Sequence, residues 1–385
     1  MATTTASAGA APALRSRELP EGYAPPRDPF EIQLVAACSR ALGLTPIGIR
    51  EPLAELGLDE VSAAPTASLA SERLGRGIDG SELAAAGDVE SAAVIMRARP
   101  ITGRFDCVVP IQAVDGPMPL FGIHPAGGHV SSYTHLAREM GVGQPFYGIH
   151  SPALEPSLTP HESVDSLAAE YAGALDRRVD GPLALVGWSF GGGVAFEMAR
   201  RLRSAGRDVT LVILDFGPDD QATVPEDPED VCLMLLTYAF RLGDQAHCEA
   251  MAAMGRERAL PVIERRATEN GKLPPGFGLE RLRRMHELNV INLTALKAHR
   301  FGTYDSKLTL LRASDREAHM PSESGDPALG WTAIAAEVEV LDTPGTHFDF
   351  LGRANLPHVA RMLGEQVGAA EARSARARTS RAHAK

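Results

Sequence analysis

The sequence predicts two folded parts: an α/β domain built on a largely parallel sheet and, before it, a small all-α helical bundle. Over most of the chain, short apolar runs alternate with helical stretches, which is typical of βαβ units. Between residues 28 and 97 the apolar spacing is helical and no strand pattern occurs. The length of 385 residues suits one domain of roughly 250 residues and a smaller one.

The composition excludes several classes of protein. A net charge of −11 opposes general nucleic-acid binding. No apolar run is long enough to span a membrane, and the first residues lack the basic and apolar regions of a signal peptide, so we expect a cytoplasmic protein without a membrane partner. The four cysteines, Cys38, Cys107, Cys232 and Cys248, are scattered, which predicts buried reduced thiols, no disulfide and no metal site.

Changes in composition set the expected boundaries. Residues 1–27 are rich in Ala, Thr, Ser and Pro and indicate a disordered leader, and the basic residues 371–385 indicate a disordered tail. The helical domain is expected over 28–97, with helices beginning at Asp28 and after Asp59. A linker over 98–116 then leads to the α/β domain at 117–370.

The α/β domain has six expected strands and one long interruption. The strands are Leu120–His124, Phe146–Ile149, Leu183–Trp188, Val209–Asp215, Leu308–Arg312 and Val338–Leu341. The interruption, about residues 217–303, contains three amphipathic helical patterns, at Asp230–Leu242, Arg256–Thr268 and Leu279–His299. A connection this long in a compact domain is usually functional, and we interpret it as a helical lid.

Gly187-Trp-Ser-Phe-Gly191 is a G-x-S-x-G motif that identifies Ser189 as the candidate nucleophile. It ends an apolar strand and opens a helix, which is the setting of a nucleophile elbow and predicts an α/β-hydrolase fold. The N-terminus of that helix favours negative charge on the attacked carbonyl, so the backbone amide of Phe190 is an expected oxyanion donor.

The expected base is His347, in the loop Thr343-Pro-Gly-Thr-His347 after the last strand. Two carboxylates are candidates for the acid, because both follow the carboxyl ends of strands. Asp215 is preferred and Asp315 is the alternative. A second oxyanion donor is expected after an early strand, in His124-Pro-Ala-Gly-Gly128, where the amide of Ala126 is the candidate.

These motifs resemble the thioesterase domains of nonribosomal peptide and polyketide synthetases. The resemblance extends over about residues 117–367 and includes Leu120-Phe-Gly-Ile-His-Pro-Ala-Gly-Gly, Leu183-Ala-Leu-Val-Gly-Trp-Ser-Phe-Gly-Gly and Pro344-Gly-Thr-His. It implies an acyl-enzyme on Ser189, loaded from a phosphopantetheine thioester. Multidomain members of the family place the acid as at Asp215, and free-standing members place it as at Asp315.

The helical domain resembles the carrier domains that precede such thioesterases, through Leu42-Gly-Leu and Leu53-Ala-Glu-Leu-Gly-Leu-Asp59. Carrier domains continue Asp-Ser-Leu, and the serine bears phosphopantetheine, whereas this chain reads Asp59-Glu60-Val61. Glu60 has no hydroxyl to modify. Ser62 lies two residues further along the helix and faces elsewhere. We therefore expect no bound cofactor and a substrate presented by a separate carrier protein.

Three hypotheses follow. The leading one is a serine thioesterase that releases an acyl or peptidyl chain by hydrolysis in natural-product biosynthesis. The second is an acyltransferase or cyclase, in which an amine or hydroxyl replaces water. The third belongs to another class, a non-catalytic adaptor that binds carrier proteins.

Overall fold

The computed structural model describes residues 14–103, 105–315 and 325–383. The chain divides into two compact units. The helical unit holds the described residues before Arg27 together with Phe30–Phe105, and the hydrolase unit holds Arg27–Pro29 and residues from Asp106 onward. Each unit is described separately below.

Four helices form the helical unit: α1 (Pro29–Leu42), α2 (Glu60–Leu74), α3 (Gly80–Ala86) and α4 (Val89–Arg97). Aspartates cap the last three, at Asp59, Asp79 and Asp88, where each carboxylate accepts a backbone N–H of the first turn. These caps confirm that the second helix begins after Asp59. The helix continues through Pro65, so this proline does not break it.

A buried ion pair links the first and last helices of this unit. The Arg97 guanidinium lies 3.3 Å from the Glu31 carboxylate, and both side chains are inaccessible to solvent. Arg97 also lies over the Phe30 ring, 5.7 Å from its centroid. Because an unpaired buried charge is costly, loss of either partner is expected to destabilise α1 and α4 together.

The leader is ordered where the structure describes it, contrary to prediction. Strand β1 (Arg15–Ser16) pairs in parallel with β2 (Leu44–Thr45). Arg17 then donates to the Glu51 carboxylate and to the Pro46 carbonyl. Backbone pairing and this ion pair hold a segment whose composition alone indicates disorder. Residues 1–13 of the predicted leader lie outside the described residues.

The hydrolase unit is built on a seven-stranded sheet with the order β3-β5-β4-β6-β7-β8-β9. The strands are β3 (Val108–Gln112), β4 (Leu120–Ile123), β5 (Phe146–Ile149), β6 (Leu183–Trp188), β7 (Val209–Leu214), β8 (Tyr304–Ala313) and β9 (Ala335–Thr343). The six predicted strands are confirmed, and all six pair in parallel. Strand β3 pairs antiparallel to β5 and lies inside the predicted linker 98–116, which was therefore wrong for these residues.

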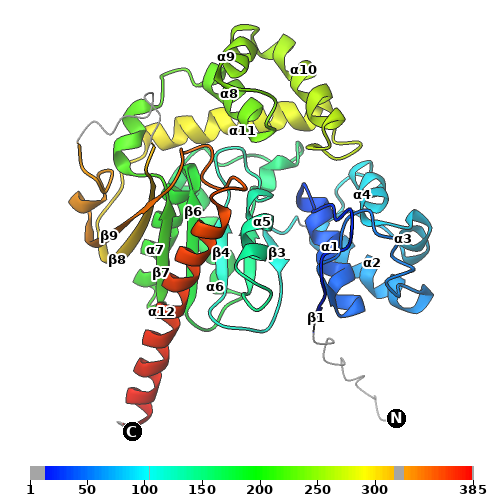
Figure 1. The fold of residues 1–385 in the computed structure, drawn as a ribbon, viewed down its shortest axis with the longest axis horizontal. Helices are drawn as coiled ribbons and strands as arrows, with labels where there is room; N and C mark the ends of the chain where they lie inside the picture. The colour runs from blue at the N-terminus through cyan, green and yellow to red at the C-terminus, as the bar shows by residue number, and fades with distance from the viewer. Residues whose placement is uncertain (1–13, 104, 316–324, 384–385) are drawn as a thin grey trace. The chain divides into compact units, whose positions relative to one another are not determined.

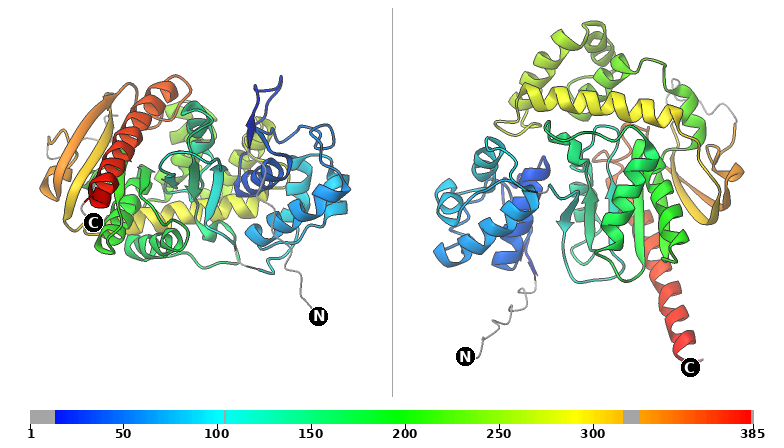
Figure 2. Two further views of the ribbon diagram at one scale, coloured as in Figure 1. Left: turned by 90° about the horizontal axis from the view of Figure 1, so that it is seen from below. Right: turned by 180° about the vertical axis from the view of Figure 1, so that it is seen from behind.

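Helices cover both faces of the sheet (Figures 1 and 2). In Figure 1, α12 (Leu356–His383) passes in front of the sheet, on the same face as α5 (Ser132–Glu139). The rear view in Figure 2 shows α6 (Val164–Asp176) and α7 (Phe190–Ser204) on the opposite face. Strands β6 and β7 are almost entirely buried between these layers, as expected for central parallel strands.

The predicted lid is a helical layer beyond the carboxyl ends of the strands (Figure 1). After the short 3-10 helix Pro218–Thr223 it contains α8 (Glu229–Ala239), α9 (Gln245–Ala253), α10 (Arg256–Glu269) and α11 (Gly278–Ala298). The short α9 was not predicted. The lid has its own apolar core, which includes Leu233, with Met234, Met251 and Met254 packed against it. Leu235 packs against the main core instead.

The predicted disordered tail is also wrong over most of its length. Helix α12 continues to His383, and within it Ser374 donates a hydrogen bond to the Asp208 carboxylate. Residues 371–383 are rich in Ala and Arg, which have high helix propensity, so a helix begun by the packed residues of α12 continues through them.

The described residues give two further observations. The four cysteines are buried, and none of them forms a disulfide within the described residues. No helix in the described part of the chain combines the length and apolar character needed to cross a membrane.

Candidate active site

Ser189 occupies a strained turn between β6 and α7. Its φ of 56° and ψ of −131° lie where residues other than glycine are seldom found. Its N–H donates to the Leu214 carbonyl of β7, and its own carbonyl accepts the N–H of Gly192. Such strain persists only where the surroundings enforce it, and it is common at functional sites. The arrangement is the elbow predicted from the sequence.

The glycines flanking Ser189 are needed because backbone segments approach closely. A Cβ on Gly187 would lie 2.1 Å from the Gly191 carbonyl oxygen. A Cβ on Gly191 would lie 2.5 Å from the Ile123 carbonyl oxygen and 2.7 Å from that of His124. The elbow is therefore pressed against the carboxyl end of β4, where the predicted oxyanion loop begins.

Asp215 and His347 meet at the same edge of the sheet. His347 Nδ1 lies 2.8 Å from Asp215 Oδ2, and both side chains are buried. The other carboxylate oxygen of Asp215 accepts the N–H of Ala313 at 2.8 Å. Asp215 itself has a positive φ of 47°. With Nδ1 donating its proton to the carboxylate, Nε2 of His347 is left as the proton acceptor.

The alternative acid lies elsewhere. Asp315 is exposed, and its backbone N–H donates to the Gly345 carbonyl in the loop that carries His347. The Asp215 carboxylate therefore contacts the His347 ring, whereas Asp315 contacts this loop through a backbone hydrogen bond to Gly345.

Aromatic contacts position the histidine loop. The Trp188 indole lies 5.8 Å from the His347 ring between centroids. Phe348, the next residue, stacks on Tyr238 of α8 with centroids 4.5 Å apart and an interplanar angle of 1°. The lid and the loop of His347 are therefore in direct contact.

The two expected oxyanion residues lie on the segments that meet at the elbow. Phe190 is the first residue of α7 and is buried, as is Ala126 in the loop after β4. The carbonyl of Ala126 accepts a 2.7 Å hydrogen bond from the buried Asn292 side chain on α11. This bond turns the Ala126 carbonyl toward the lid. Asn292 was not among the predicted site residues, because its partner is a backbone group 166 positions away.

Tyr133 lies between the ends of β4 and β6, the strands that precede the oxyanion loop and the elbow. It was not among the predicted site residues. Its buried hydroxyl donates to the Ile123 carbonyl at 2.8 Å and accepts the Trp188 N–H at 3.1 Å. Ile123 is paired with Gly187 in the ladder between β4 and β6. The Tyr133 hydroxyl therefore bridges β4 and β6 where a direct backbone hydrogen bond between Trp188 and Ile123 would otherwise continue the ladder. A tyrosine in an amphipathic helix gives no sequence signal for this role.

His124 is a buried structural residue beside the oxyanion loop. Its Nδ1 lies 2.8 Å from the Pro125 carbonyl oxygen, and its Nε2 lies 2.9 Å from the Tyr171 hydroxyl. A neutral ring with the proton on Nδ1 satisfies both partners. Burial lowers the pKa of His124 to about 3.

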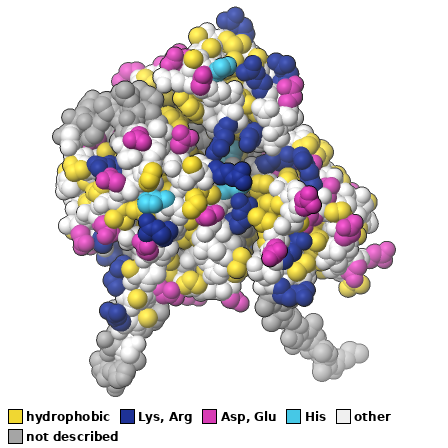
Figure 3. Space-filling model, viewed as in Figure 1, with side chains coloured by type: hydrophobic (Ala, Val, Ile, Leu, Met, Phe, Trp, Pro, Cys, Tyr) yellow, Lys and Arg dark blue, Asp and Glu magenta, His cyan; other side chains and the backbone are white. Residues whose placement is uncertain are grey.

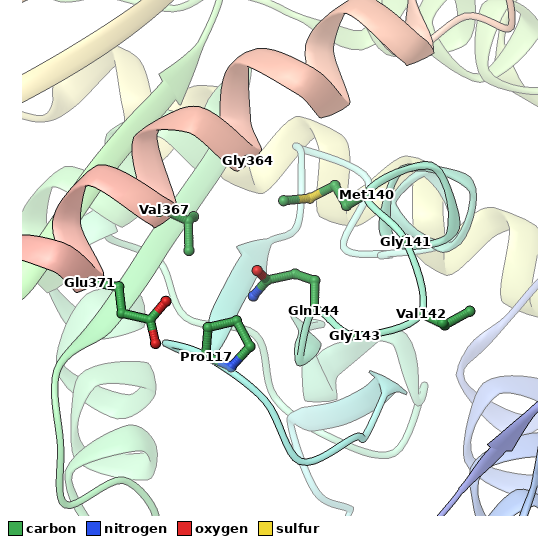
Figure 4. Close-up of a pocket in the computed structure, with 10 residues that line it drawn as sticks. Pro117, Met140, Gly141, Val142, Gly143, Gln144, Gly364, Val367 and Glu371 are labelled. Atoms are coloured by element: carbon green, nitrogen blue, oxygen red, sulfur yellow. The ribbon is translucent and has the colours of Figure 1, made fainter.

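A separate pocket of about 340 Å³ lies away from this site (Figure 4). Its lining includes Pro117 and Gln144, which precede β4 and β5, and Gly364 and Val367 of α12. It therefore opens near the amino ends of these strands, whereas Ser189 and Asp215 follow carboxyl ends. In the described ranges no three His, Cys, Asp or Glu side chains are grouped so that they could hold a metal ion.

A strained serine elbow on a largely parallel sheet, a helical lid and a histidine loop after the last strand define an α/β-hydrolase. A family model described as "Thioesterase domain" matches residues 118–367. The chain therefore belongs to the thioesterase domain family and is a hydrolase of the thioesterase type.

Similar proteins include two synthetases. The dimodular nonribosomal peptide synthase of Bacillus subtilis (strain 168) is 31% identical over 208 residues, 53% of this chain and 9% of the relative. Atromentin synthetase greA of Suillus grevillei is 37% identical over 109 residues, 28% of this chain and 11% of the relative. The chain thus spans a small part of the relatives it matches.

Solved structures share the fold. The structure of holo-AB3403, a four-domain nonribosomal peptide synthetase bound to AMP and glycine, matches 90% of this chain and 27% of its own, with a TM-score of 0.75 and 24% identity. The wild-type Vlm2 thioesterase domain matches 67% of this chain and 96% of its own, with a TM-score of 0.53 and 24% identity.

Proposed function

We propose that this chain releases acyl or peptidyl chains from phosphopantetheine thioesters in nonribosomal peptide or polyketide biosynthesis, using Ser189, His347 and Asp215. The hydrogen bond between His347 and Asp215 carries the proposal, since it leaves Nε2 as a proton acceptor on a ring whose centroid lies 5.8 Å from that of Trp188, the residue before the strained Ser189. The family and the synthetase relatives support the thioester substrate class.

The reaction has two balanced halves. The Ser189 hydroxyl attacks the thioester carbonyl and gives its proton to His347 Nε2, while the amides of Ala126 and Phe190 stabilise the oxyanion. The carbon–sulfur bond breaks, and His347 returns the proton to the departing thiolate. Water then loses a proton to His347, attacks the acyl-serine and releases the carboxylic acid, and His347 reprotonates Ser189.

The helical unit supports a substrate delivered in trans. Glu60 is exposed at the first turn of α2, where the carrier pattern has its modified serine. The Ser62 hydroxyl is engaged in a capping box with Asp59, at 2.7 Å from a carboxylate oxygen. We assign residues 28–97 a carrier-like docking role, with the acyl chain brought by another carrier protein.

The test is mass spectrometry of an acyl-phosphopantetheinyl carrier protein incubated with the wild type or with Ser189→Ala. We expect the wild type alone to remove the acyl mass from the carrier. Ser166→Ala, a substitution at the first turn of α6, is the matched control and should behave as wild type.

The products separate the remaining hypotheses. A free acid indicates hydrolysis, whereas an amide, ester or macrocycle indicates transfer to an amine or hydroxyl. An unchanged carrier, with no acyl mass on Ser189 for several acyl groups, would contradict the catalytic proposal and favour a carrier-binding adaptor.

A further inference from the structure

Cationic side chains from four separate segments act on one histidine, His135 of α5. His135 is exposed, and its pKa is lowered first by desolvation of the ring and then by the charges of Arg138, Arg241, Lys272 and Arg353. Arg138 lies on the same helix, with a guanidinium nitrogen 3.3 Å from His135 Nδ1. Figure 3 shows Lys and Arg side chains gathered beside histidine on this face of the hydrolase unit, below the lid. We call the four cations the cationic rim.

Three cations of the rim have no acidic partner. Arg241, Lys272 and Arg353 are exposed, and none forms an ion pair with a residue in the ranges that the structure describes. Elsewhere on this unit arginines pair with carboxylates, as Arg178 does with Asp106. In a chain with a net charge of −11, an uncompensated group of cations is a local exception that favours an anionic ligand.

The backbone conformation of Arg241 also favours a binding role for this residue. Arg241 follows α8 with a φ of 52°, in the left-handed conformation that glycine or asparagine adopts at lower cost. Its N–H donates to the Tyr238 carbonyl, and the N–H of Leu242 donates to that of Thr237. A long cationic residue is therefore held at a position that suits glycine, and strain of this kind is common at binding sites.

The rim adjoins the catalytic loop. Arg353 follows His347 by six positions on the connection to α12. Arg241 follows Tyr238, whose ring stacks on Phe348 next to His347. Lys272 follows the end of α10 in the lid, where its N–H donates to the Ala267 carbonyl. The rim thus draws on α5, two lid connections and the histidine loop.

We infer that the cationic rim binds the phosphate of the pantetheine arm while the thioester at the other end of the arm reaches Ser189. The inference rests on the proposed function, because that function supplies the phosphate-bearing substrate. Guanidinium and ammonium groups are the side chains that bind phosphate, and several acting on one anion give both attraction and orientation. The rim would position the arm, and it takes no part in bond making.

The first experiment measures binding without turnover. Acyl-4′-phosphopantetheine and acyl-pantetheine, which lacks the phosphate, are titrated into Ser189→Ala protein and into the same protein carrying Arg241→Asn, Lys272→Gln and Arg353→Gln. We expect Ser189→Ala to bind the phosphorylated compound about tenfold more tightly than the other, and the added substitutions to abolish this difference. Asparagine keeps the left-handed backbone at position 241.

The control removes a comparable charge from another place. Arg177 is an exposed residue after α6, and no described side chain forms an ion pair with it. Arg177→Gln should retain the preference for phosphate. Equal binding of the two compounds by Ser189→Ala protein would overturn the inference. If the rim substitutions lower only the melting temperature and leave the preference intact, the cations serve the helix ends instead, and the inference also fails.

Turnover separates this inference from the proposed function. With an N-acetylcysteamine thioester, which carries no phosphate, the rim variant should keep the wild-type kcat/KM. With an acyl carrier protein its KM should rise about tenfold at an unchanged kcat. If the rim variant discriminates against the carrier protein but not against free acyl-4′-phosphopantetheine, the cations bind an acidic carrier surface and the phosphate assignment is wrong. Absence of all turnover would contradict the proposed function while the binding titration still tests the rim.

Discussion

The side chain of Asn292 holds the backbone carbonyl of Ala126 at 2.7 Å, so a helix of the lid directly restrains the loop proposed to carry an oxyanion donor. A peptide carbonyl turned into that site would repel the developing negative charge. The bond keeps this carbonyl pointed toward α11. The lid is therefore expected to influence the chemical step as well as substrate access.

The first prediction concerns Asn292. Asn292→Leu removes the donor, leaves the Ala126 carbonyl without this partner and should lower kcat roughly tenfold to hundredfold, with a smaller change in KM, because the interaction acts through the oxyanion. The matched control is Asn289→Leu, since the Asn289 amide donates to the Met285 carbonyl within its own helix. Steady-state kinetics on a soluble thioester measures both. Equal losses of kcat in the two variants would contradict a specific role for Asn292.

The second prediction concerns the acid. In Asp215→Asn the amide oxygen can still accept the N–H of Ala313, and the amide nitrogen then faces His347 Nδ1 and favours the wrong tautomer. We expect kcat to fall about 10⁴-fold with the fold preserved. Asp315→Asn, at the exposed alternative position, should change kcat less than about twofold. A large loss in Asp315→Asn with little effect at Asp215 would reverse the assignment.

The third prediction concerns the elbow. In Gly191→Ala the new methyl group would lie 2.5 Å from the Ile123 carbonyl oxygen, so the backbone must move. We expect the free energy of unfolding to fall by about 1–3 kcal/mol and turnover to be lost. Gly181→Ala is the control, because no atom lies within 4 Å of its added Cβ. Chemical denaturation followed by circular dichroism measures both variants, and similar stability of the two would show that the elbow relaxes without cost.

The fourth prediction concerns pH. Burial holds the pKa of His124 at about 3 in the folded protein, below its ordinary value of 6.5. As the pH falls below 6.5, the unfolded chain takes up a proton that the folded protein does not, so the free energy of unfolding decreases. Between about pH 7.5 and about pH 5 this residue should account for roughly 2 kcal/mol of that decrease. Urea denaturation of wild type and His124→Gln at both pH values tests it, and an identical decrease in the two proteins would contradict it.

The fifth prediction concerns the helical unit. Incubation with coenzyme A and a phosphopantetheinyl transferase should leave the wild type unmodified, because Glu60 has no hydroxyl and Ser62 is held in the cap of α2. Glu60→Ser should gain one phosphopantetheinyl group by intact-protein mass spectrometry. The double variant with Ser62→Ala should gain it equally. Modification of the wild type at Ser62 would restore a carrier in cis.

The central part of the fold could be predicted from the sequence because its signals are local. Runs such as Leu183–Trp188 are apolar throughout, and a buried parallel strand needs no other feature. The antiparallel β3 escaped prediction because a proline and a glutamine interrupt its short run, and its position depends on pairing with β5. The same holds for β1, whose two residues are ordered only by a partner strand.

The site likewise contains some residues with local sequence signals and others that depend on contacts with distant segments. Ser189 and His347 lie in glycine-containing motifs, and chain order indicates their placement. Chain order leaves both Asp215 and Asp315 open as the acid, because each follows the carboxyl end of a strand. Tyr133 and Asn292 act on backbone groups of distant segments, and a backbone carbonyl leaves no trace in the sequence. The cationic rim was missed for a related reason, because its members are separated along the chain and only the lid and the histidine loop bring them together.

The burial of the cysteines has a consequence for an enzyme that meets thioesters. An acyl chain exchanges readily between a thioester and a thiolate, and a thiol that stays protonated does not take part. Burial raises the pKa of Cys38 to about 12 and that of Cys248 to about 11. These two thiols therefore stay protonated and do not exchange with thioester substrates. The acyl group is left to form an ester with a serine oxygen, and water can hydrolyse that ester.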